Sequence, residues 1–98
     1  MPPSVVEFHP DAVDEAVAAR QWYQARSISA ADAFLAELDH AIEAISTHPE
    51  RWPHCVHDTR RYLFRRFPFQ FVYRTAGTVV QVIAVAHGRR KPGYWKTR

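Results

Sequence analysis

The stretch RRYLFRRFPFQFVYRTAGTVVQVIAVA, residues 60–86, decides the fold. Polar and apolar side chains alternate from Arg60 to Phe67, which predicts a strand with Leu63, Arg65 and Phe67 on one face. Residues 69–74 alternate in the same way with their aromatic side chains on one side, and Pro68 and residues 75–78 provide the turns. Residues 79–86 carry almost no polar side chain, so we expect a central strand covered on both faces.

The residues before this stretch predict one more strand and two helices. Residues 4–8 form a short β-branched run that ends at His9-Pro10. Residues 11–26 place alanines and Tyr23 at helical spacing, and a second helix begins near Ser29, a good N-cap, and ends at Pro49. Because only about three residues join the two helices, they are expected to form an antiparallel hairpin.

The order of elements predicts a single α+β domain over residues 1–98, with the order β-α-α-β-β-β. The αα-hairpin is expected to pack on a small, mostly antiparallel, twisted sheet. The side chains expected in the core between helices and sheet are Phe34, Leu38, Ile42, Ile45, Leu63, Phe71, Tyr73, Val82 and Ala84.

Composition excludes several classes of protein. The chain has 98 residues, 47% of them hydrophobic and 23% charged, which is typical of one globular domain. Its one cysteine, Cys55, excludes an internal disulfide and favours a reducing compartment. The first residues do not resemble a signal peptide, and no apolar run approaches the roughly 20 residues of a membrane span. We therefore expect a cytoplasmic protein with no membrane contact.

Charge is distributed unevenly between the two halves of the chain. Residues 1–50 hold nine acidic and two basic side chains, a charge of −7, whereas residues 51–98 hold eleven basic and one acidic, a charge of +10. Such asymmetry indicates that a polyanion or an acidic partner meets the C-terminal half.

The candidate site lies where the apolar strand ends. His87 stands at that end. The basic residues of the strand at 60–67 and of the chain after His87 are expected to form an anion-binding surface, because guanidinium groups pair bidentately with phosphate or carboxylate. Tyr94 and Trp95 are candidates for stacking on bases or anchoring a protein; the alternative for Trp95 is that it folds back over the sheet. The residues of this surface are Arg60, Arg61, Arg65, Arg66, Arg89, Arg90, Lys91 and Arg98.

A metal or cofactor site is not expected. His48, His54, Cys55 and His57 are close in sequence, but their spacing matches no standard zinc pattern, and we expect all four in one loop. The chain also lacks a Gly-rich phosphate loop and paired carboxylates.

Nearly the whole chain resembles the RelE/ParE superfamily of type II toxins, including toxins of the plasmid-stabilisation type. The most specific motifs are Trp22-Tyr23, Phe67-Pro68 and the His-Gly-Arg-Arg-Lys-Pro run that begins at His87. These motifs belong to four stretches that resemble the family in the same order: DAVDEAVAARQWYQ, AFLAELDHAIEAISTHPERWP, RRYLFRRFPFQFVYR and VIAVAHGRRKPGYWKTR. It implies a small bacterial toxin that inhibits growth. It also implies a hetero-oligomer with an antitoxin, encoded beside it, whose flexible segment wraps the domain.

The superfamily divides by target, and the sequence allows more than one of these targets. The resemblance slightly favours a ParE-like inhibitor of DNA gyrase, with Arg60, Arg61, Arg89, Arg90, Lys91, Trp95 and Arg98 as the target-binding residues. The alternative is a RelE-like endonuclease that cuts messenger RNA on the ribosome, with His87, Arg65, Arg89 and Tyr94 as catalytic residues. Apart from the resemblance, charge alone also allows a non-toxic basic nucleic-acid-binding module, which would bind any nucleic acid in a salt-dependent way.

Overall fold

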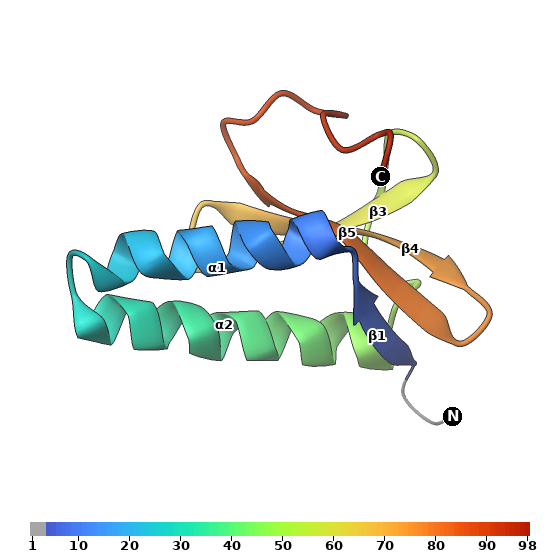
Figure 1. Cartoon of the computed structure of the whole chain (residues 1–98). Coiled ribbons are helices and arrows are strands. Elements are labelled where there is room, and N and C mark those ends of the chain that lie inside the picture. Colours follow the sequence, from blue (N-terminus) through green and yellow to red (C-terminus); the bar gives the residue numbers. More distant parts are fainter. Residues whose placement is uncertain (1–3) are drawn as a thin grey trace.

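The structure, a computed structural model, describes residues 4–98. Two helices lie side by side along one face of a five-stranded sheet, and the C-terminal segment runs over the other face (Figure 1). The predicted α+β fold is confirmed, with one short additional strand before the meander. In chain order the elements are β1 (Val5–Phe8), α1 (Pro10–Gln24), α2 (Ile28–Thr47), β2 (His54–Cys55), β3 (Thr59–Leu63), β4 (Phe69–Ala76) and β5 (Val79–His87).

The sheet has the strand order β1-β5-β4-β3-β2. All neighbouring pairs are antiparallel except β1 and β5, which pair in parallel from Val5 opposite Val79 to Phe8 opposite Val82. Because β1 ends at that point, residues 83–87 of β5 have no neighbouring strand on this side among residues 4–98. The second half of β5 is therefore an open edge that other groups must cover.

The αα-hairpin forms as predicted, with a shifted cap. His9 precedes α1, and its Nδ1 accepts a hydrogen bond from the backbone N–H of Asp11 at 3.1 Å. The N-cap of α2 is Ser27, not Ser29: the Ser27 hydroxyl accepts from the N–H of Ala30 at 3.2 Å. Residues 25–27 connect the helices, so the connection is as short as the sequence indicated.

The core between the helices and the sheet is rich in aromatic side chains. Phe34 of α2 is fully buried, and its ring lies between 5.3 and 6.0 Å from the rings of Tyr23, Phe64, Phe67 and Phe69. Of the other predicted core residues, Ile45, Phe71, Tyr73 and Val82 are fully buried here, and Leu38 and Ile42 pack half-buried at the border.

Two predicted core residues are placed elsewhere. Leu63 is 61% exposed, so its assignment to the core was wrong. Ala84 is buried, but on the opposite face of the sheet, with Val72 and Trp95. The cause is a β-bulge: Val72 pairs with Ala84 and Tyr73 with Val82, which leaves Ile83 without a partner and shifts the alternation of β5 by one residue.

The third strand ends earlier than predicted. β3 stops at Leu63, whereas the sequence indicated a strand to Phe67. One carboxylate, that of Glu37 on α2, accepts hydrogen bonds from the backbone N–H groups of Arg65 at 3.0 Å and Arg66 at 2.9 Å. The chain therefore turns toward the helices, and Phe67 packs on Phe34 instead of sharing the face of Leu63.

No helix within residues 4–98 is long and apolar enough to cross a lipid bilayer.

Candidate functional site

Five exposed cations gather at one end of the sheet, and we call this group the basic end. Two turns bring them together: the turn between β3 and β4, and the turn after β5. The N–H of Gly88 donates to the carbonyl of Pro68 at 2.8 Å, so the two turns are in direct contact. The members of the basic end are Arg65, Arg66, Arg89, Arg90 and Lys91.

Both turns have defined backbone positions. The hydrogen bonds that Glu37 accepts fix the backbone of Arg65 and Arg66, and because the acceptor is charged, these bonds are stronger than neutral ones. In the second turn, the N–H of Arg89 donates to Nδ1 of His87 at 3.1 Å, and the N–H of Arg90 donates to the His87 carbonyl at 3.0 Å. The backbone that carries the cations of the basic end is thus held in place by hydrogen bonds.

His87 is half-buried at the base of this cluster. Its ring meets Phe69 edge-on, with the centroids 5.2 Å apart. Since Nδ1 accepts from Arg89, Nε2 is the nitrogen that remains for a ligand or for proton transfer.

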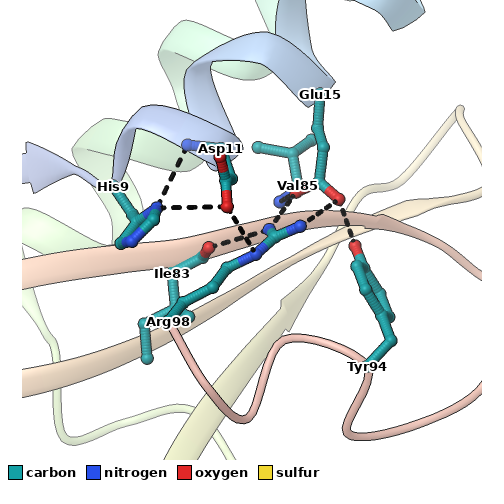
Figure 2. Close-up of polar contacts among 7 residues, drawn as sticks. All are labelled: His9, Asp11, Glu15, Ile83, Val85, Tyr94 and Arg98. Carbon is teal, nitrogen blue, oxygen red and sulfur yellow. Dashed lines mark hydrogen bonds and ion pairs between the residues drawn. The ribbon is translucent and has the colours of Figure 1, made fainter.

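The chain after β5, residues 88–98, contains turns but no helix or strand, and we call it the tail. Its far end is held by Glu15 of α1 (Figure 2). One carboxylate oxygen accepts from the backbone N–H of Val85 at 3.0 Å and from the Arg98 guanidinium at 2.7 Å. The other accepts from the Tyr94 hydroxyl at 2.5 Å and from Arg98 at 3.2 Å. We call Glu15, Tyr94 and Arg98 the Glu15 anchor.

The Glu15 anchor covers the open edge of β5 with side chains. Arg98 also donates to the carbonyl of Ile83 at 3.1 Å, and its Nε lies 3.5 Å from a carboxylate oxygen of Asp11. A backbone donor and a backbone acceptor that β1 leaves unpaired are therefore satisfied by α1 and by the tail.

Burial and charge raise the pKa values of Tyr94 and Arg98 by different routes. Burial is the largest cause that raises the pKa of Tyr94 above its usual 10.0, and the hydrogen bond to Glu15 raises it further. Burial acts to lower the pKa of Arg98, but the hydrogen bond and the charge of Glu15 outweigh it, so the pKa of Arg98 rises. Tyr94 is thus a neutral hydroxyl donor and Arg98 a permanent cation.

Trp95 is the second point that holds the tail. Its indole is 2% exposed and packs on Val72, Ala84 and neighbouring small side chains of the sheet. The ring of His57 meets it edge-on at 5.8 Å. Glycine is needed at position 93 for two reasons. Its φ of +84° is strained for other residues, and a Cβ there would lie 3.2 Å from Nε2 of His57.

A groove of about 450 Å³ opens between α1 and the tail. Trp22 stands at its rim, 53% exposed, with the guanidinium of Arg26 3.5 Å from its ring centroid. The Arg90 guanidinium lies 3.9 Å from the ring centroid of Tyr94 on the tail side. The groove is lined by Glu15, Ala18, Ala19, Trp22, Tyr23, Pro68, Phe69, Val85, His87, Arg90 and Tyr94.

The structure divides the predicted site residues into two groups. Arg65, Arg89, Arg90 and Lys91 lie exposed at the basic end beside His87, and Arg61 is exposed on β3. The others make internal contacts. The Arg60 guanidinium donates to the carbonyls of Glu50 and Trp52, Arg98 and Tyr94 bind Glu15, and Trp95 is buried, which is the alternative considered for it above.

The histidine-rich segment is spread over several elements. His48 is the C-cap of α2, His54 and Cys55 form β2, and His57 packs on Trp95, so they do not occupy one loop. Within the described residues, no three His, Cys, Asp or Glu side chains are grouped as a metal site would require.

Sequence reasoning missed Glu15 and Glu37. Each is only partly exposed and binds residues far along the chain. A signal exists for Glu15, which lies among the alanines that the helical period places on the inner face of α1. A carboxylate beside such a stripe needs a cation or a donor from the opposite layer.

The two helices on a mixed sheet, with β1 parallel to β5, define the α+β fold of the RelE/ParE toxins. This fold is shared by the toxin–antitoxin complex "Chromosomal ParDE TA system from P. aeruginosa" (TM-score 0.74, 16% identity, 86% of this chain and 95% of that chain). It is shared also by the RelBE2 toxin–antitoxin complex from Mycobacterium tuberculosis (TM-score 0.60, 22% identity, 89% of this chain and 93% of that chain). The chain belongs to the ParE toxin family of type II toxin–antitoxin systems, whose model matches residues 6–92. No curated protein sequence matches it.

Proposed function

We propose that this chain inhibits bacterial growth from the cytoplasm by binding DNA gyrase through the basic end. Membership of the ParE family supports the gyrase branch of the superfamily. The five exposed cations, with Nε2 of His87 beside them, supply the charged surface that such binding needs.

The main support for this proposal is that few groups at the site are free to transfer a proton. Cleavage of RNA by its own 2′-hydroxyl needs a base, an acid and cations around the phosphate. The Tyr94 hydroxyl donates a hydrogen bond to Glu15, and Nδ1 of His87 accepts one from the N–H of Arg89. Among the predicted catalytic residues, this leaves Nε2 of His87 as the atom for proton transfer. A single such atom supports a binding surface over a nuclease site.

The test compares wild type with His87→Ala in two assays. We expect the wild type to inhibit supercoiling by purified gyrase and to leave cellular messenger RNA uncut. His87→Ala should weaken inhibition by less than about 30-fold, the scale of one lost contact, not by the 10²–10⁴-fold of a lost acid or base. New cuts within codons that His87→Ala abolishes, together with unaffected gyrase, would establish the nuclease alternative and overturn the proposal.

We propose further that an antitoxin segment occupies the groove between α1 and the tail. Solved relatives of this fold are toxin–antitoxin complexes, which supports such a partner. The groove offers aromatic side chains such as Trp22 for apolar anchors, and Arg90 and His87 at one side for carboxylates. An amphipathic segment with acidic residues is the complement of this surface.

A pair of matched alanines tests the groove. Ala18 lines the groove on α1, and Ala36 is an exposed alanine on α2 outside it. Ala18→Leu takes up groove volume and should weaken the affinity for the protein encoded beside the gene by about tenfold or more in calorimetry. Ala36→Leu, the same change on the other helix, should leave the affinity within about twofold. Equal affinities for the two variants would place the antitoxin elsewhere.

A further inference from the structure

The position of the tail depends on few contacts. It has no regular secondary structure, so backbone ladders do not hold it. Beyond the turn at residues 88–90, where Gly88 contacts Pro68, the tail is held by the buried Trp95 and by the Glu15 anchor. Trp95 fixes the middle of the tail against the sheet. The Glu15 anchor fixes the side that faces α1 and the groove.

Glu15 is built into the fold as a junction. Its side chain is 17% exposed, and both carboxylate oxygens accept two hydrogen bonds each. The donors come from β5 and from two points of the tail, so one side chain joins three segments. Four bonds to one charged acceptor hold their donors far more firmly than a single neutral bond does.

A short chain of contacts leads from Glu15 to the basic end. The carboxylate holds the Tyr94 hydroxyl at 2.5 Å, which fixes the orientation of the ring. The Arg90 guanidinium lies on that ring, 3.9 Å from its centroid. Arg90 is exposed and lines the groove, so its preferred position is set by a ring that Glu15 holds in place.

We propose that Glu15 is a positioning residue of the binding site: through the Tyr94 hydroxyl it places Arg90 at the mouth of the groove. This inference rests on the proposed function, since it assigns Glu15 a role in target binding. Glu15 itself touches no target, and its effect on binding passes through Tyr94 and Arg90.

A double-mutant cycle separates positioning from stability. Tyr94→Phe keeps the ring and removes the hydroxyl that donates to Glu15. Arg90→Ala removes the guanidinium that lies on this ring. We expect gyrase inhibition to weaken about 3–10-fold in Tyr94→Phe and about 5–30-fold in Arg90→Ala. The double variant should be no weaker than Arg90→Ala alone, because the hydroxyl acts through the cation. Glu15→Gln, which keeps the shape and removes the charge, also weakens the bonds to Arg98 and should lose at least as much inhibition as Tyr94→Phe.

The matched control is Tyr73→Phe. The Tyr73 hydroxyl donates to the carbonyl of Pro49 at 2.6 Å, so the same atom is lost from a tyrosine on the face of the sheet that the helices cover. Tyr73→Phe should leave inhibition within about twofold. Fully additive losses in Tyr94→Phe and Arg90→Ala, or an equal loss in Tyr73→Phe, would overturn the positioning role.

Hydrogen exchange gives a second measurement that does not depend on the target. Tyr94→Phe should speed amide exchange in residues 88–98 by about tenfold or more and leave α1 and α2 unchanged, whereas Tyr73→Phe should leave the tail unchanged. If the wild type does not inhibit gyrase, the proposed target is wrong, and this comparison decides the role of Glu15 by itself. Equal tail exchange in the two variants would overturn it.

Discussion

The two faces of the sheet are covered in different ways. On one face, α1 and α2 bury a continuous aromatic and aliphatic core around Phe34 and Phe71. On the other, an irregular tail inserts Trp95 over a few small side chains and relies on the Glu15 anchor (Figures 1 and 2). The helix face holds the fold, and the tail face holds the part of the basic end that follows β5 in position. Changes on the helix face should therefore act on stability, and changes on the tail face on binding.

The largest effect is expected on the helix face. Phe34 is fully buried and contacts four other aromatic rings, so Phe34→Ala leaves a cavity in the main core. We expect a loss of about 3–5 kcal/mol in the free energy of unfolding, measured with urea. Leu35→Ala, at the next residue, is the control: Leu35 is 40% exposed and should lose less than about 1 kcal/mol. Equal losses would mean that α2 presents another face to the sheet.

A smaller and more local effect is expected on the tail face. Trp95→Ala removes the indole that covers Val72 and Ala84, and we expect a loss of about 2–3 kcal/mol, because a short tail can detach instead of enclosing a cavity. Hydrogen exchange should show the tail released and the helices intact. Trp22→Ala removes the same side chain from a site that is 53% exposed and should change stability little. A global loss of helix protection in Trp95→Ala would contradict the division between the faces.

The pH dependence of stability should also show a contribution from Tyr73, which is buried on the helix face. Burial raises the pKa of Tyr73 from 10.0 to about 12, partly opposed by Arg60. The unfolded chain therefore loses this proton near pH 10 and the folded chain keeps it until about pH 12. The stabilisation is present below pH 10 and is lost as the pH rises from 10 to 12.

Tyr73→Phe isolates this contribution. Between pH 10 and 12 its free energy of unfolding should fall less steeply than that of the wild type, by about 1.4 kcal/mol per pH unit. Urea unfolding at several pH values measures both slopes. Identical slopes would show that the Tyr73 hydroxyl ionises in the folded protein as it does in water.

Local pattern predicts the core residues of regular elements and fails where contacts between distant residues decide the structure. The helical spacing on α2 and the alternation of β4 identify Phe34 and Phe71 as core residues, because burial there follows the period of each element. The end of β3 could not be predicted, since it depends on a carboxylate of Glu37 that lies far away in sequence. The face of Ala84 depends on a bulge at Ile83, which no local signal marks.

The candidate site shows the same limit. The uneven distribution of charge along the chain pointed to the cations of the basic end, because charged residues can be counted from the sequence. It did not distinguish Arg90, which is exposed, from Arg98, whose guanidinium is bound to Glu15. That distinction depends on which carboxylate the folded chain brings to each arginine, and so it needs tertiary structure.

Inhibition of purified gyrase by paired arginine variants tests the central claim most directly. Arg89→Ala/Arg90→Ala removes two cations from the basic end, and Arg51→Ala removes one exposed cation from the loop before β2. We predict that the wild type and Arg51→Ala inhibit supercoiling equally, within about twofold. The double variant should need at least about 30-fold more protein, with an unchanged free energy of unfolding. Equal inhibition by all three proteins would contradict a target-binding site at the basic end.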